Sequence, residues 1–171
     1  MALAAPYDAR VVANLILDMA EERGLELTQV SLLKILYFSH GWFLALNDRP
    51  LIKQDFEAWK HGPVVKVVRD EFKRFGGGPI SSRATRLDLL TGSRIEVPAV
   101  VSGSDYDFVQ AIFDEYRGYS AWQLSDMTHE RGSPWDRIWH SSEPLGRLAL
   151  RIHNEDIKNH FRLSARRSAP L

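Results

Sequence analysis

The segment from Thr28 to Leu46 constrains the fold most, because its side chains leave almost no polar face. Thr28 is a typical N-cap residue, and the apolar positions after it recur at helical spacing. A helix that is apolar nearly all round has to be covered by other elements. We therefore predict a central helix. Its apolar residues are Val30, Leu32, Leu33, Ile35, Leu36, Phe38, Trp42, Phe43 and Leu46.

Gly41 lies in the middle of this predicted helix, on a stripe of small or polar residues that includes Ser31 and Ala45. An interior glycine costs about 1 kcal/mol relative to alanine. Its presence therefore indicates that another backbone packs closely against this side of the helix. Close helix packing is favoured over a ligand groove as the meaning of the stripe.

Amphipathic patterns predict further helices around the central one. Asp8 caps the first, which Gly24 ends, and Ser120 and Gln123 form the capping box of a later one. Ser104 caps the helix before that box. The expected helical ranges are 8–23, 28–46, 63–75, 105–116, 121–129, 134–139 and 155–162.

Extended structure is expected in two places. Leu51–Ile52 and Phe56–Trp59 resemble two short strands, which we expect to form a small hairpin. Gly62 and Pro63 then open a helix, because the missing N–H of a proline would be unbonded at the first helical position anyway. Residues 80–103 have no helical period and predict a loop with short, peripheral strands.

These elements predict a mainly α (α+β) fold, a single compact helical domain of about six to seven helices with a small β-hairpin. A chain of 171 residues that is 44% hydrophobic can fill one core of that kind. We expect the domain to span residues 1–163 and residues 164–171 to form a flexible tail.

Composition narrows the possible functions. Lys plus Arg and Asp plus Glu number 22 each, so the whole chain has no field that would attract nucleic acid or a membrane. The absence of cysteine excludes disulfides, thiolate nucleophiles and cysteine-ligated metals. The start of the chain lacks the basic region of a secretory signal, which predicts a cytoplasmic protein.

No pattern of reactive residues predicts catalysis. The six histidines form neither an H-E-x-x-H pair nor a cluster with carboxylates at ligand spacing. Ser39 and His40 are neighbours, and adjacent side chains on a helix diverge, so they form no dyad. No strained serine turn and no phosphate-binding loop is present. We therefore expect no catalytic site, no cofactor and no metal.

Three blocks of sequence resemble a known family. They are the run from Leu32 to Gly41, the run from Phe56 to Val64, and Leu124–His129 followed by Ser133–Trp135. In this order they are similar to the Panacea domain, formerly described as a domain of unknown function in phage-associated proteins, and they span roughly residues 9–135. The resemblance implies a helical domain that acts as an antitoxin.

What the resemblance implies about partners is specific. A Panacea antitoxin binds and neutralises a protein toxin encoded beside it. The SocA-like branch further implies a proteolytic adaptor that presents a SocB-like toxin to the ClpXP protease. Some relatives carry an additional DNA-binding module, which this chain has no room for. Autoregulation by direct DNA binding is therefore not expected.

The shared residues have a structural interpretation. Tyr37 and Trp59 are large amphipathic side chains typical of a scaffold. Gly62 and Pro63 fix a sharp turn, across which His40 and His61 could form a hydrogen bond. The motif residues, as structural or partner-binding positions, are Lys34, Tyr37, His40, Trp59, His61, Gly62, Pro63, Ser125, His129, Pro134 and Trp135.

Two alternative functions remain open. A hydrolase would need His40, His61 and Asp55 to converge in a pocket. A nucleic-acid-binding regulator would use the helix from Lys66 to Arg74, although acidic residues interrupt its positive charges and a solvated surface is the simpler interpretation.

Overall fold

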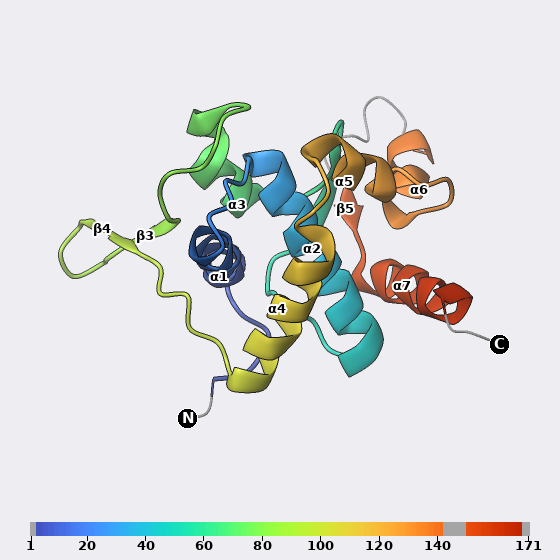
Figure 1. The fold of residues 1–171 in the computed structure, drawn as a ribbon, viewed down its shortest axis with the longest axis horizontal. Coiled ribbons are helices and arrows are strands. Elements are labelled where there is room, and N and C mark those ends of the chain that lie inside the picture. Colours follow the sequence, from blue (N-terminus) through green and yellow to red (C-terminus); the bar gives the residue numbers. More distant parts are fainter. Residues whose placement is uncertain (1–2, 142–149, 169–171) are drawn as a thin grey trace.

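The structure is a computed structural model that describes residues 3–141 and 150–168. Its described residues form seven α-helices and five short strands, which confirms the mainly α fold with a small strand element (Figure 1). The helices are α1 (Ala9–Glu22), α2 (Gln29–Asn47), α3 (Lys66–Phe72), α4 (Gly103–Tyr116), α5 (Ala121–Thr128), α6 (Pro134–Ser141) and α7 (Asn154–Ser168). The strands are β1 (Phe56–Trp59), β2 (Gly62–Val64), β3 (Thr85–Leu87), β4 (Arg94–Glu96) and β5 (Arg151–Ile152).

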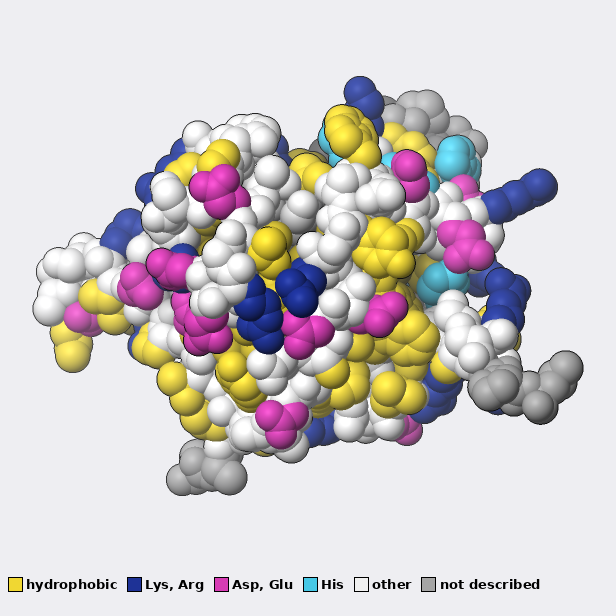
Figure 2. All heavy atoms as spheres, viewed as in Figure 1, with side chains coloured by type: hydrophobic (Ala, Val, Ile, Leu, Met, Phe, Trp, Pro, Cys, Tyr) yellow, Lys and Arg dark blue, Asp and Glu magenta, His cyan; other side chains and the backbone are white. Residues whose placement is uncertain are grey.

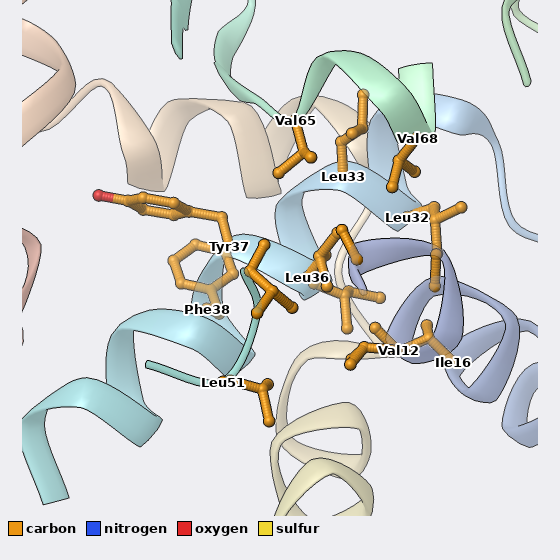
Figure 3. Packing of buried hydrophobic residues seen from close by; sticks show 14 of the residues in the cluster. Val12, Ile16, Leu32, Leu33, Leu36, Tyr37, Phe38, Leu51, Val65 and Val68 are labelled. Carbon is orange, nitrogen blue, oxygen red and sulfur yellow. The ribbon is translucent and has the colours of Figure 1, made fainter. Parts of the chain in front are cut away.

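Helix α2 is the central element, as the sequence predicts. Thr28 caps it by accepting a 3.2 Å hydrogen bond from the backbone N–H of Ser31, and nearly all of its residues are buried. In Figure 1 the other helices surround it. Figure 3 shows Leu32, Leu33 and Leu36 of α2 packed with aliphatic side chains of α1 and α3 in one cluster. An all-apolar helix therefore becomes the axis of the core.

Helix α7 covers the side of α2 that carries Gly41. A Cβ atom at Gly41 would lie 2.2 Å from Cε2 of Phe161 in α7. The expectation of a close approach at Gly41 is therefore confirmed in position, but an aromatic ring approaches rather than a backbone. Gly41 is required because the ring of Phe161 fills the space that any larger side chain would need.

Helix α4 begins earlier than predicted, and helix α7 ends later. Helix α4 begins at Gly103, because the hydroxyl of Ser102, not Ser104, accepts a bond from the N–H of Asp105. Helix α7 continues to Ser168, so residues 164–168 of the predicted tail are helical, while residues 169–171 lie outside the described residues. The Ser164 hydroxyl donates to the carbonyl of His160, within the helix. The expected end at Arg162 was wrong because polar residues with little periodicity still continue a helix once it has begun.

The hairpin forms one segment later than predicted. Strand β1 pairs antiparallel with β2 and with β5, in the order β2-β1-β5, whereas Ile52 makes only an isolated bridge to Tyr7. Gly62 and Pro63 therefore lie in a strand, and the helix starts at Lys66.

Proline is compatible with this strand because β2 is at the sheet edge. Its partner Ala58 turns its own N–H to the carbonyl of Leu150 on the other side, so the ladder requires no N–H from Pro63.

The second hairpin, β3–β4, is peripheral, which confirms the expectation for residues 80–103. Its strands pair Thr85 with Glu96 and Leu87 with Arg94. In Figure 1 its turn extends away from the helices. Its strand residues are exposed apart from Thr85, which is half-buried.

Charged side chains of both signs are mixed over the face shown in Figure 2, without a large area of one sign. Within residues 3–141 and 150–168 no helix is long and apolar enough to cross a membrane. The same residues contain no group of three or more His, Asp or Glu side chains placed to hold a metal ion.

Candidate functional site

The motif residues gather around the β1–β2 hairpin. Three side chains from three different helices each donate a hydrogen bond to a carbonyl oxygen of the hairpin, at every second residue. We call these three donors the carbonyl clamp. The bonds run from Trp135 Nε1 to Trp59 O (2.7 Å), from Ser125 Oγ to His61 O (3.2 Å) and from Lys34 Nζ to Pro63 O (3.0 Å).

The clamp is needed because the hairpin is covered by helices. A buried carbonyl without a hydrogen bond costs about 1–3 kcal/mol. Pro63 of the edge strand β2 faces away from β1, so its carbonyl has no neighbouring strand to bond with. Lys34 of α2 supplies that donor, while Ser125 of α5 and Trp135 of α6 bond to carbonyls in the turn and at the end of β1. Three of the sequence-predicted site residues therefore fix the position of the hairpin.

Two independent requirements make glycine the only residue that fits at position 62. Its φ of +104° lies in a region that residues with side chains rarely adopt. A Cβ atom there would also lie 2.5 Å from Thr128 Oγ1 and 2.7 Å from Lys34 Cε. The hairpin can approach α2 and α5 this closely only with glycine at position 62.

Lys34 is a buried amine with one protein hydrogen bond, to Pro63. It is 1% exposed, and burial lowers its pKa to about 7. Among the described residues no carboxylate lies within ion-pair distance of it. A buried, unpaired ammonium is unfavourable, so the protein tolerates a cost here to hold the hairpin carbonyl.

His129 lies at the C-terminal end of α5, beside the clamp residue Trp135. Its ring stacks on Trp135 at 3.8 Å between centroids. Burial, and then the nearby charge of Lys34, lower its pKa. Its buried Nε2 makes no hydrogen bond to any residue that the structure describes. His129 therefore supports the indole of the clamp by packing. Pro134 begins the helix that carries Trp135.

Tyr37 and Trp59 are scaffold residues in the structure. The ring of Tyr37 is buried and meets Phe56 of β1 edge-on at 5.1 Å, and burial raises the pKa of its hydroxyl. In Figure 3 this hydroxyl points away from the labelled aliphatic side chains. Trp59 donates from its indole to Glu57, and Arg69 lies over its ring at 4.6 Å.

The predicted hydrogen bond between His40 and His61 does not form. His40 is buried, with its Nε2 2.8 Å from Asn154 Oδ1, and the N–H of Ile52 donates to its Nδ1. Burial lowers its pKa to about 4. His61 is exposed at the hairpin turn, with its ring edge-on to Trp122.

The two histidines are separated because Lys34, not His40, lies beneath the turn, and His40 is six residues, or about 9 Å, further along α2. Asp55 pairs with Arg151 at 3.0 Å. The constellation that a hydrolase would use at His40, His61 and Asp55 is therefore absent from the described residues.

Three of the four positive side chains of the Lys66–Arg74 segment contact a single carboxylate, that of Asp70, which offsets part of their charge. Asp70 forms ion pairs with Lys66 (2.5 Å), Arg69 (3.4 Å) and Lys73 (3.3 Å). This pairing leaves the segment as an ordinary solvated helix surface. It gives the alternative of nucleic-acid binding through these side chains no support.

A groove opens beside the clamp, next to Trp122, which no sequence motif pointed out. Its volume is about 320 Å³ and its walls are mainly apolar. Trp122 is 71% exposed at its side. The signal available in the sequence was a tryptophan in the first turn of a short capped helix, where little covers a large ring. We call this the Trp122 groove; its lining residues are Thr28, Val30, His61, Gly77, Ala121, Trp122 and Ser125.

Sequence comparisons match most of the chain. The family model described as "Antitoxin SocA-like, Panacea domain" matches residues 32–136, a range that contains all the clamp residues. The protein named "Antitoxin SocA" from Caulobacter vibrioides is 39% identical over 155 residues, which is 91% of this chain and 82% of that relative. No solved structure matches.

Proposed function

Because this chain belongs to the SocA-like Panacea family of antitoxins, we propose that it acts by binding a protein toxin directly and neutralising it. The single observation that carries the proposal is that the three clamp residues donate to hairpin carbonyls and thereby hold the hairpin in one position. The motif then builds a rigid platform, and the surface around that platform contacts the toxin.

The Trp122 groove is the binding surface we propose on that platform. Exposed tryptophans beside apolar hollows are typical anchor points of protein interfaces. The groove borders the hairpin turn at His61, whose position the clamp determines. A rigid surface binds with a smaller loss of conformational freedom than a mobile one. A stable complex needs about 800 Å² per partner, so Trp122 would lie within a larger contact area.

The finer parts of the proposal rest on the resemblance. The toxin would be SocB-like and encoded by the neighbouring gene. Neutralisation would proceed by masking the toxin or by presenting it to ClpXP as a proteolytic adaptor. The proposal includes the cytoplasmic location predicted from the sequence.

The experiment is co-expression with the product of the adjacent gene. We expect the wild-type chain to restore growth and to co-purify with that product. Trp122→Ser should weaken both effects. The control Leu46→Ser, at an exposed apolar residue elsewhere (65% exposed), should weaken neither. An adjacent gene product that remains toxic and unbound beside the wild-type chain would overturn the proposal. If the two variants behave equally, the Trp122 groove is not the toxin-binding surface.

Toxin masking and protease delivery can be separated in the same cells. If the chain acts as an adaptor, the toxin level should fall in cells with ClpXP and recover in cells without it. If the chain acts by masking, growth should be restored in both strains while the toxin level stays constant.

A further inference from the structure

The tip of the β3–β4 hairpin displays two neighbouring leucines to solvent. Leu89 is 89% exposed and Leu90 is 96% exposed, and Leu87 beside them is 53% exposed. Single exposed apolar residues are ordinary, but adjacent leucines at a projecting turn form a patch typical of interaction sites. In Figure 1 this turn lies away from the body of helices.

The turn that carries these leucines is ordered by its own hydrogen bonds. Asp88 accepts a bond from the N–H of Leu90 at 3.0 Å and one from the hydroxyl of Thr91 at 2.9 Å. The carbonyl of Asp88 also accepts from the N–H of Gly92, at 2.8 Å. The bond from Leu90 is the main reason that the pKa of Asp88 is lowered. The leucines are thus held in one geometry without being covered.

The base of the hairpin is also anchored, by a side chain of α1. Asn14 of α1 is buried and donates from its side-chain amide to the carbonyls of Ala84 and Val97, at 3.1 and 2.8 Å. Ala84 directly precedes β3 and Val97 directly follows β4, so both lie at the base of the hairpin. Asn14 also accepts from the N–H of Ala84. The arm is therefore fixed at both ends, and binding through it would require little further ordering.

The charges on the arm indicate what kind of surface it fits. Arg94 pairs with Glu71, and Arg83 pairs with Asp18 and Glu21. Arg86 is exposed, and no carboxylate within the described residues lies at ion-pair distance from it, although its charge contributes to the lowered pKa of Asp88. Among the described residues, one exposed cation without an ion-pair partner beside two leucines is too little for stable attachment to an anionic lipid surface, which needs several. It suits an apolar cleft with an acidic rim on a folded protein.

We propose that the β3–β4 tip is a second docking point for the toxin, with Leu89 and Leu90 inserted into an apolar cleft on that protein and Arg86 facing an acidic group at its edge. This inference rests on the proposed function. It adds a contact that is separate from the Trp122 groove and lies outside the clamp.

The test measures affinity for the purified product of the adjacent gene by calorimetry. Replacing both tip leucines, Leu89→Ser with Leu90→Ser, should weaken binding at least about tenfold, because each leucine loses an apolar contact. The Leu46→Ser control should bind like the wild type. The melting temperature of each variant is measured alongside, and we expect it to be unchanged because the tip is exposed.

The outcomes distinguish this inference from the function it rests on. Wild-type binding that the double tip variant leaves intact would overturn the docking point alone. A wild-type chain that does not bind overturns the proposed function and the docking point together. Self-association that the tip variant abolishes would assign the leucines to a second copy of this chain. Flotation with phosphatidylserine vesicles that depends on them would assign them to a membrane. Either result would overturn the inference.

Discussion

The molecule contains two small antiparallel hairpins with opposite relations to their surroundings. In β1–β2 the strand residues are mostly buried, and side chains from three helices bond to three of its carbonyls. In β3–β4 nearly all strand residues are exposed, and the tip is held by bonds within its own turn. The same local structure serves as a fixed internal support in one case and as a projecting arm in the other.

The two hairpins differ in their hydrogen-bonding partners more than in their strand pairing, and these partners determine which residues the stability of each hairpin depends on. The first hairpin depends on Lys34, Ser125 and Trp135, so changes far away in the sequence should destabilise it. The second depends on Asp88 and Asn14, so its tip should tolerate substitution without loss of the fold. Four experiments test this contrast, in order of decreasing effect.

Gly62→Val should have the largest effect on stability, a loss of more than about 3 kcal/mol, because valine meets both a strained φ and the atoms of Thr128 and Lys34. Gly92→Val is the matched control in the other hairpin, since Gly92 has a φ of +71° but no atom within 4 Å of a Cβ. The control should lose only about 1–2 kcal/mol. Urea unfolding measures both, and equal losses would contradict the close approach at Gly62.

Lys34→Met should change how stability depends on pH. The unfolded lysine has a pKa near 10.5 and the folded one about 7, so between these values the unfolded state binds more protons. The wild type should therefore gain stability relative to Lys34→Met as the pH rises from about 7 to 10, by up to roughly 1.4 kcal/mol per pH unit. Below pH 7 both states are protonated and the difference should be constant. Parallel pH profiles would show that the amine is not buried as described.

Trp135→Phe removes the indole donor of the clamp. The part-buried carbonyl of Trp59 then loses this donor, and we expect a loss of about 0.5–1.5 kcal/mol. Trp122→Phe is the same exchange at an exposed ring, and its stability should change by less than about 0.5 kcal/mol. Thermal unfolding of the two variants provides the comparison. A clamp variant as stable as the exposed one would show that the bond to Trp59 O contributes nothing.

Asp88→Ala should have the smallest effect on stability and still be informative. It opens the turn at the tip of β3–β4 while keeping both leucines, so the melting temperature should be unchanged. Affinity for the adjacent gene product should decrease, because the leucines would have to be ordered on binding. Unchanged affinity would show that the turn geometry is irrelevant to docking, even if the leucines themselves matter.

Much of the helical architecture could be predicted from local signals. Asp8, Thr28 and Ser120 cap the helices that they were expected to cap, and the capping box of Ser120 with Gln123 is present. Local chemistry decides these positions, so a single sequence contains the information. Gly62–Pro63 was assigned to a helix because a glycine-proline pair suits a helix start and an edge strand equally well. Only the neighbouring strand decides between them.

The site could be predicted as a set of residues but not as an arrangement. The family resemblance selected Lys34, Ser125 and Trp135, yet nothing local shows that they donate to alternate carbonyls of one hairpin. That pattern depends on three helices separated by many residues. It is also why His40 was expected near His61: both lie in motif runs, but α2 carries His40 past the hairpin to Asn154.

The fit of Phe161 against Gly41 has a consequence for the order in which this protein assembles. His40 and Asn154 are 114 positions apart, so one flank of α2 stays uncovered during synthesis until the distant helix α7 has been made. The aromatic rings on that flank face water until α7 packs against them. A copy that ends before α7 would leave these rings open to chaperones and proteases.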